Sequence, residues 1–170
     1  MRVIDAKALE KRRQKTVKAR RRQDRHPYFH GVAEARYLLR KVFRLVEEEA
    51  GRAGIDPLAH QGLIQIYGSP QGMLRVKDVA ERLDITPAFA SNLVKSLAQK
   101  RYVERAADSG DNRVSWIKIA KRGRELLHRI DERVQAKVDR FTATLGEGQT
   151  EAALSILLFY AGASFRRSTR

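Results

Sequence analysis

The sequence predicts a mainly α-helical protein with one small β-hairpin, and three observations lead to this fold class. Apolar residues recur at three- and four-residue steps over most of the chain, which is the period of an amphipathic helix. The pattern changes to that of strands only around residues 103–106 and 114–119, and the turn-forming run Asp108–Asn112 separates these two segments. The 170 residues are 42% hydrophobic, which is enough to bury a core.

Six helices are expected, because six segments have a repeating apolar face with helix-ending signals around it. They cover residues 29–50, 57–67, 75–83, 86–100, 120–143 and 149–164. Asp56 and Thr86 are expected to cap two of them, since each precedes a proline that suits the first helical turn. Gly51 and Gly54 end the first helix, and residues 68–72 form a loop.

The basic residues are concentrated at the N-terminus. The chain has a net charge of +15, and residues 1–30 carry 11 basic and 3 acidic side chains. Residues 1–27 can form a helix but lack a sustained apolar face. This arm is either a contact to the DNA backbone or a solvated, partly ordered tail, and charge alone does not decide between the two.

The composition excludes several classes of protein. The chain has no cysteine, so disulfide scaffolds, cysteine-based zinc sites and thiol chemistry are excluded. The N-terminus lacks the apolar region of a signal peptide, and no segment is apolar enough to span a membrane, so we expect a soluble cytoplasmic protein. The excess positive charge favours a polyanionic partner, either nucleic acid or an anionic membrane surface.

Residues 74–119 carry the functional signal, because their pattern is helix, tight turn, helix and hairpin. Two short helices joined in this way form a helix-turn-helix, whose second helix can enter the major groove of DNA. We expect a left-handed backbone at Asp84 in the turn, and Ala80 is small enough for the point where the helices cross. Double-stranded DNA, and not a membrane, is therefore the expected partner.

The second of these helices is expected to have two distinct faces. Its buried face is apolar and consists of Ala90, Leu93, Val94 and Leu97. The opposite face carries small, amide and cationic side chains suited to base edges and phosphates, which are Ala88, Ser91, Asn92, Lys95 and Gln99. Phe89 lies on the flank, where it either touches a thymine methyl group or, as we favour, plugs the edge of the domain.

The hairpin offers a second contact to DNA. Arg113 follows the turn and can enter a narrow minor groove, where the negative potential is enhanced. Asp111 can hold the guanidinium of Arg113 in place by a charge-assisted hydrogen bond. The alternative is a surface Asp–Arg pair that contributes little.

Four consecutive segments resemble the winged helix-turn-helix of the MarR family in order and spacing, and they are Thr86–Leu97, Lys100–Arg105, Asp108–Arg113 and Lys121–Leu127. The resemblance extends over about residues 29–165. It implies N- and C-terminal dimerisation helices, a homodimer on a pseudo-palindromic operator, and a mostly repressive role. It also implies release by a small effector ligand, often aromatic and acidic, bound between the dimerisation helices and the DNA-binding lobe. Two departures are the length of residues 1–27 and Ala120, which replaces a common capping threonine.

Four regions are expected: a basic arm (1–27), a dimerisation helix with a second helix (28–67), a DNA-binding lobe (68–119), and a connecting helix with a C-terminal dimerisation helix (120–170). The dimer interface is expected to bury the apolar stripe Val32–Val46 and the set Leu154, Leu157, Leu158 and Ala161. The expected DNA contacts are Thr86, Ala88, Phe89, Ser91, Asn92, Lys95, Asp111 and Arg113. The candidate ligand residues offer a ring, a cation and a switchable donor, and they are Tyr37, Arg40 and His60.

Catalytic chemistry is not recognisable in the sequence. His26 and His30 are four residues apart, but Pro27 lies between them and no acidic ligand is near, so we expect no metal site. Glu47–Glu49 is interpreted as a solvated helix face, and we expect no enzyme and no cofactor. Two functions remain: a ligand-responsive transcriptional regulator, or a non-specific DNA-packaging or scaffold protein. Only the regulator should prefer one operator strongly.

Overall fold

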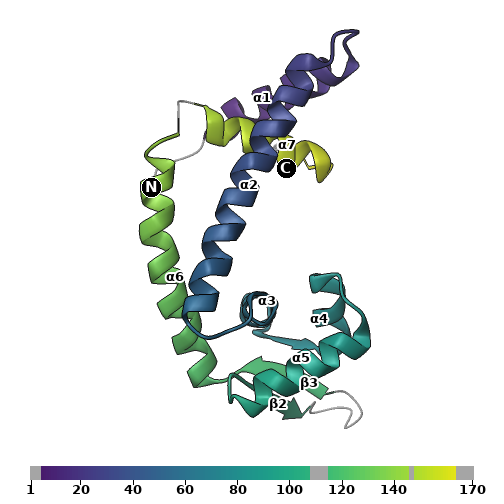
Figure 1. Ribbon diagram of the computed structural model, residues 1–170. Helices are drawn as coiled ribbons and strands as arrows, with labels where there is room; N and C mark the ends of the chain where they lie inside the picture. The colour runs from purple at the N-terminus through teal and green to yellow at the C-terminus, as the bar shows by residue number, and fades with distance from the viewer. Residues whose placement is uncertain (1–4, 108–114, 146–147, 164–170) are drawn as a thin grey trace. The chain divides into compact units, whose positions relative to one another are not determined.

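The computed structural model describes residues 5–107, 115–145 and 148–163, which are helical apart from one small sheet (Figure 1). The helices are α1 (Ala6–Arg21), α2 (His26–Arg52), α3 (Pro57–Tyr67), α4 (Val76–Leu83), α5 (Pro87–Gln99), α6 (Lys121–Thr142) and α7 (Gln149–Tyr160). The strands are β1 (Met73–Arg75), β2 (Val103–Ala107) and β3 (Ser115–Ile119). The predicted fold class is therefore confirmed. None of the described helices is both long and apolar enough to cross a bilayer.

Contacts within the chain form two compact units. Unit 1 consists of Met1–Arg44 and Val138–Arg170, and unit 2 consists of Leu45–Lys137. Helices α2 and α6 supply residues to both units. This division into two units does not test the four functional regions expected from the sequence, which stay a prediction.

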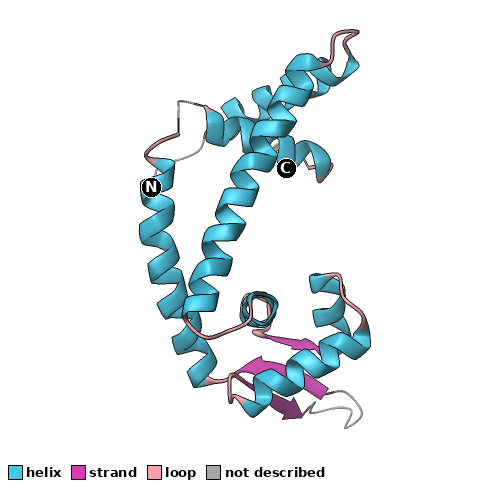
Figure 2. Cartoon of the chain, in the orientation of Figure 1, coloured by secondary structure: helices cyan, strands magenta, loops and turns pink. Residues whose placement is uncertain are grey.

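Unit 2 contains the three-stranded sheet, with β3 in the centre (Figure 2). β1 and β2 both pair antiparallel with β3, so that Leu74 and Arg105 lie opposite Ile117 from its two sides. β2 and β3 are the predicted hairpin. The sequence pattern does not predict β1, because three residues are too few to show an alternation and their partner strand lies far along the chain.

The core of unit 2 combines side chains from five helices and the three strands. Eight of them are at most 1% exposed, and they are Ala50, Leu63, Ile66, Val79, Leu97, Ile117, Leu126 and Ile130. The predicted cap of α3 is confirmed, since the Asp56 carboxylate accepts hydrogen bonds from the amides of Leu58 at 2.9 Å and Ala59 at 3.1 Å. Such a cap contributes about 1 kcal/mol of stability.

The hairpin is held closely against the start of α6. The carbonyl oxygen of Tyr102 accepts a hydrogen bond from the amide of Ala120 at 2.9 Å. Gly123, in the first turn of α6, faces the same carbonyl group so closely that a Cβ atom would overlap it. The glycine therefore permits an approach that any side chain would prevent.

Unit 1 has a separate, smaller core. Tyr28, Val32, Ala35 and Leu38 of α2 pack with two side chains of α7, Ala153 and Ile156. Val32 and Ala35 belong to the stripe that the sequence assigns to a dimer interface, but they are buried within the chain instead. The large apolar side chains that α2 leaves exposed are Phe29, Tyr37, Val42 and Phe43.

The basic N-terminal arm is a helix that packs on its own chain. α1 lies against α7 within unit 1, and its Leu9 side chain is only 4% exposed (Figure 1). Residues 6–21 therefore form a helix with packing contacts to α7. The sequence missed this arrangement because the apolar partner surface belongs to a helix more than a hundred residues further on.

Candidate nucleic-acid interface

The helix-turn-helix consists of α4 and α5, and local chemistry sets the turn between them. Asp84 adopts the predicted left-handed backbone, with φ of 53°, and ends α4. The amide of Ile85 then donates to the carbonyl of Ala80 at 3.0 Å. Thr86 caps α5 as predicted, because its hydroxyl oxygen accepts a hydrogen bond from the amide of Phe89 at 3.3 Å.

α5 has the two faces that its sequence predicts. Ala90, Val94 and Leu97 are at most 4% exposed and fix the helix to the core of unit 2. The expected polar face points outward: Ala88, Asn92, Lys95 and Gln99 are exposed, and Ser91 is half-buried. Side chains in these positions are accessible to solvent.

Phe89 does not plug the edge of the lobe, contrary to the interpretation favoured from the sequence. Its side chain is 52% exposed. The ring is exposed because Phe89 lies on the flank of α5, one residue before the buried Ala90. An exposed ring in this place is available for an apolar contact with a partner.

The tip of the hairpin carries the other expected contacts. Asp111 and Arg113 lie outside the described residues. The strands that lead to them are described, and the β2–β3 pairing runs from Val103 opposite Ile119 to Ala107 opposite Ser115.

Beside Trp116, near the end of β3 that adjoins the hairpin turn, lies a cation that sequence reasoning missed. The Arg75 guanidinium lies 5.4 Å from the centre of the Trp116 ring on β3. Its Nε atom is 2.9 Å from a carboxylate oxygen of Asp78, and this hydrogen bond holds the pKa of Asp78 below its ordinary value. The Arg75–Asp78 pair is local in sequence, but no sequence signal could have placed Trp116 beside it, because β1 brings Arg75 to Trp116 only through strand pairing.

Positive charge is divided unevenly between the two units. Unit 2 has 16 basic and 13 acidic residues, whereas unit 1 has 19 basic and 7 acidic residues. α5 itself contributes one cation, Lys95, and Lys118 on β3 is paired with Glu104 at 3.2 Å. The helix-turn-helix lobe is therefore only weakly basic, and most of the excess charge of the protein lies in unit 1.

Unit 2 also contains a cavity of about 290 Å³ between α3 and α6. Its walls combine apolar side chains with His60, Tyr67, His128 and Asp131. His60 is 3% exposed, and its Nδ1 atom has no hydrogen-bond partner among the described residues. Burial lowers the pKa of His60, although the nearby Asp131 carboxylate opposes the shift, so the imidazole is neutral at pH 7. A buried polar atom without a partner is costly unless a ligand or water meets it.

Of the three ligand residues expected from the sequence, only His60 lines this cavity. Tyr37 and Arg40 belong to the part of α2 that lies in unit 1, and both are exposed. Sequence reasoning missed Tyr67 and His128, whose rings lie 6.4 Å apart, because nothing in the pattern distinguishes them from ordinary surface residues.

The acidic run at the end of α2 is only partly a solvated face. Glu47 and Glu48 are exposed as expected, but Glu49 is 3% exposed, and the expectation is wrong for this residue. Its carboxylate pairs with Lys137 of α6 at 2.6 Å and with Arg52. The hydrogen bond from Lys137, followed by that from Arg52, lowers the pKa of Glu49.

A helix-turn-helix with an exposed polar face on its second helix, followed by an antiparallel hairpin, defines a winged helix-turn-helix protein. The model of the MarR family matches residues 53–113. The part of the chain that forms the winged helix-turn-helix is therefore similar to the MarR family.

Among curated relatives, the uncharacterized HTH-type transcriptional regulator YwhA of Bacillus subtilis is 23% identical over 86 residues. The alignment covers 51% of this chain and 62% of YwhA, which is less than two thirds of that relative's length. The sequence similarity to YwhA is therefore limited to part of each protein.

Three solved structures share the fold. The YusO protein of Bacillus subtilis aligns with a TM-score of 0.57 at 22% identity, over 76% of this chain and 90% of YusO. Apo MarR of E. coli aligns with a TM-score of 0.60 at 19% identity, over 74% of this chain and 91% of MarR. Sco3205 of Streptomyces coelicolor is a MarR family transcriptional regulator that was solved in complex with DNA. It aligns with a TM-score of 0.60 at 23% identity, over 78% of this chain and 82% of Sco3205.

Proposed function

We propose that this chain is a homodimeric, sequence-specific DNA-binding regulator of transcription, which acts as a repressor and is released from its operator by a small ligand. The observation that carries the proposal is the two-sided α5, whose buried face fixes the helix while Asn92 and Lys95 are exposed. Sco3205 has the same fold and was solved with DNA, which supports a duplex as the partner.

Base reading is assigned to the outward face of α5. Asn92 can form a bidentate pair with the N6 and N7 atoms of adenine. Lys95 is a flexible point charge suited to a phosphate, which positions the protein without reading sequence. Ala88 and Ser91 are small enough to let the helix approach the groove floor, and the exposed Phe89 ring can meet a thymine methyl group.

The hairpin and the cap complete the proposed contacts. Arg113 enters the minor groove beside the site that α5 reads, and Asp111 orients its guanidinium. Thr86 lies at the N-terminus of α5, where exposed backbone amides and the helix dipole favour a phosphate.

Two copies of the chain are proposed to form the functional unit. Phe29, Tyr37 and Phe43 on α2 are each more than half exposed, as is Tyr160 at the end of α7. Single exposed apolar residues are common, but three large rings on one helix favour burial against a second copy. A two-fold dimer would present two α5 helices and therefore bind a pseudo-palindromic operator.

The cavity between α3 and α6 is the proposed ligand site. Its volume of about 290 Å³ suits a ligand with a single ring. An aromatic acid would place its ring beside Tyr67 and the apolar walls, and its polar group would supply the partner that Nδ1 of His60 lacks. A ligand of this kind releases the operator if it binds the DNA-free conformation better than the DNA-bound one.

The test is selection from a randomised duplex library at physiological salt, with wild type, Asn92→Ala and Lys95→Gln compared. We expect wild type to enrich one pseudo-palindromic sequence over random DNA by about 10³ or more. Asn92→Ala should change the enriched bases. Lys95→Gln is the matched control on the same face, and it should weaken binding to all sequences alike.

The rival function is a non-specific DNA-packaging or scaffold protein. Such a protein would bind the library without enriching any sequence, and Asn92→Ala would then have no effect on preference. That result would overturn the proposed regulator while leaving DNA as the partner.

A further inference from the structure

The N-terminal helix α1 is anchored to α7 by apolar, polar and ionic contacts. Leu9 is buried, and the Thr16 hydroxyl lies 3.5 Å from the hydroxyl of Ser155. Arg12 reaches a carboxylate oxygen of Glu151 at 2.8 Å. These contacts define an inward face of α1 and give the helix a fixed orientation on unit 1.

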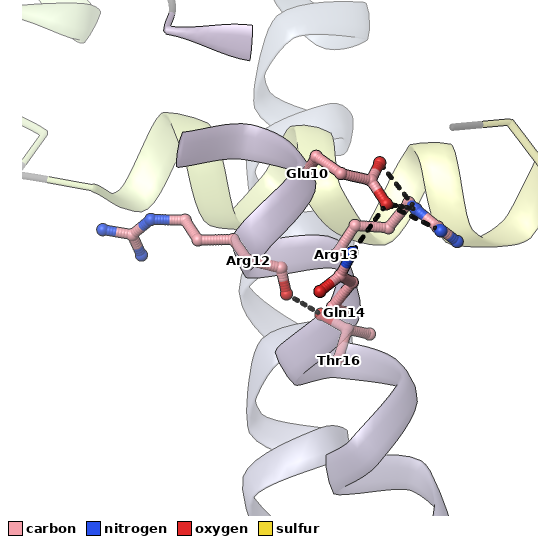
Figure 3. Close-up of polar contacts among 5 residues, drawn as sticks. All are labelled: Glu10, Arg12, Arg13, Gln14 and Thr16. Atoms are coloured by element: carbon pink, nitrogen blue, oxygen red, sulfur yellow. Dashed lines mark hydrogen bonds and ion pairs between the residues drawn. The ribbon is translucent and has the colours of Figure 1, made fainter. Parts of the chain in front are cut away.

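The acidic residue of α1 is already occupied. Glu10 is the one carboxylate in the helix, and Arg13 holds it with hydrogen bonds of 2.9 to 3.2 Å from Nη2 and Nε (Figure 3). The Gln14 amide also donates to Glu10, at 3.4 Å. Figure 3 shows Glu10 turned toward Arg13 while the Arg12 side chain extends in another direction. The carboxylate of Glu10 is therefore directed toward Arg13 and Gln14.

The outward face of α1 is a stripe of four lysines, Lys7, Lys11, Lys15 and Lys18, which we call the lysine stripe. At 3.6 residues per turn they fall within an arc of about 80° and extend over about 16 Å of helix. All four are exposed, and no ion pair joins them to an acid within the described part of the chain. Arg21 and Arg22 continue the positive charge beyond it.

Such a stripe does not stabilise the helix that carries it. Like charges four residues apart repel each other, and Lys7, Lys11 and Lys15 have this spacing. The cost is small for each pair, and no ion pair to these lysines offsets it among the described residues. An external polyanion would convert the repulsion into attraction.

We propose that the lysine stripe is a second DNA contact, which binds backbone phosphates and adds affinity without base preference. This rests on the proposed function, since it requires that the protein binds DNA. The helix-turn-helix unit has only three more basic than acidic residues, whereas unit 1 has an excess of twelve. Phosphate contacts supply a large share of protein–DNA affinity, so the weakly basic lobe needs charge from elsewhere in the chain.

A duplex fits the stripe better than an anionic membrane does. Helices that bind membrane surfaces bury a broad apolar face with large side chains such as Trp, Phe or Leu. The apolar Leu9 of α1 faces α7, and Gln14, which flanks the lysine stripe on the exposed side of the helix, is polar. Lysine ammonium groups without apolar neighbours suit phosphates in water.

The experiment replaces all four lysines with glutamine, Lys7→Gln, Lys11→Gln, Lys15→Gln and Lys18→Gln together, in the full-length chain. Glutamine has nearly the helix propensity of lysine, so α1 should remain folded and docked. The control variant replaces the same four lysines with arginine, which keeps the charge. Binding to the selected duplex and to a scrambled duplex is measured as a function of salt for all three proteins. Helix content is checked by circular dichroism.

If the stripe binds DNA, the slope of log affinity against log salt falls by about 0.9 for each phosphate that a lysine no longer neutralises, or about 3.6 for each chain. The arginine control keeps the wild-type slope, and the ratio of selected to scrambled affinity stays constant. Equal slopes for wild type and the glutamine variant would overturn the proposed DNA contact of the lysine stripe without contradicting the proposed function. If wild type binds all duplexes alike and the slope of the glutamine variant is still lower, the DNA contact of the stripe is supported and the proposed sequence-specific regulator is overturned.

Two further outcomes would also overturn the DNA contact of the lysine stripe. If wild type binds no duplex at all, both proposals fall. If the glutamine variant keeps its DNA slope but no longer binds vesicles of phosphatidylserine and phosphatidylcholine that wild type binds, the partner of the stripe is a membrane and the DNA contact is overturned.

Discussion

Replacing Gly123 with alanine should destabilise unit 2, because the added methyl group has no room. A Cβ atom at this position would overlap the carbonyl oxygen of Tyr102 and lie 2.9 Å from Cγ1 of Ile119. The Ile119 side chain is buried, at 7% exposure, and has little space in which to move. The Tyr102 carbonyl is backbone, and it already accepts the amide of Ala120 at 2.9 Å.

The expected magnitude is about 2 kcal/mol of lost unfolding free energy. Overpacking a close contact costs about 1–3 kcal/mol, and overlap with backbone places this case at the upper end. Moving the carbonyl away would weaken the Ala120 hydrogen bond, which contributes about 1 kcal/mol. Alanine is favoured over glycine in a helix by about 1 kcal/mol, which offsets part of the loss.

Urea unfolding followed by fluorescence measures the effect, since Trp116 is the single tryptophan of the chain and lies on β3 of unit 2. With a slope of roughly 2 kcal/mol per molar urea, the midpoint should fall by about 1 M. Gly51→Ala is the matched control. Gly51 is helical like Gly123, but it is exposed, and no atom lies within 4 Å of a Cβ added to it. The control should keep or slightly raise the midpoint. If both variants unfold at the same urea concentration, the close approach of Tyr102 and α6 is refuted.

Arg113→Ala should weaken operator binding by about 1–3 kcal/mol with the fold intact, and an unchanged affinity in a folded dimer would remove the wing from the mechanism. Burial lowers the pKa of His60 below 6.5, so the unfolded chain takes up this proton first and the urea midpoint should fall as pH drops through about 6.5. His60→Gln should remove that step, and an equal step in the variant would contradict the assignment. Lys137 and Arg52 lower the pKa of Glu49 below 4.5, so its contribution is present above about pH 4.5 and is lost below it. Glu49→Gln should reduce the fall of the urea midpoint below about pH 4.5. A steeper fall of the midpoint in the variant would show that the ion pair is not stabilising.

The helix-turn-helix could be predicted because its determinants are local. Asp56 and Thr86 act on amides two or three residues away, and Asp84 acts through its own backbone angle. The two faces of α5 follow from the helical period, so the burial of Val94 and the exposure of Asn92 are both confirmed. For these elements the surrounding structure adds little to what the nearest residues already specify.

Packing between distant segments could not be predicted in this way. β1 exists only because it pairs with β3, and its three residues have no strand pattern of their own. Glu49 looks like its exposed neighbours until α6 brings Lys137 within 2.6 Å of it. Phe89 shows the reverse case, since an aromatic side chain suggests burial but this one is 52% exposed among the described residues.

By itself, the sequence determined six of the helices, the hairpin, the caps and which face of α5 is exposed. Only the tertiary structure decided that the basic arm docks on α7 and that its lysines form an outward stripe, and only it brought His60 and His128 to one cavity. The physical reason is range. Hydrogen bonds and rotations within one helical turn are encoded in adjacent residues, whereas burial and charge pairing depend on side chains that the folded chain brings together from far along the sequence.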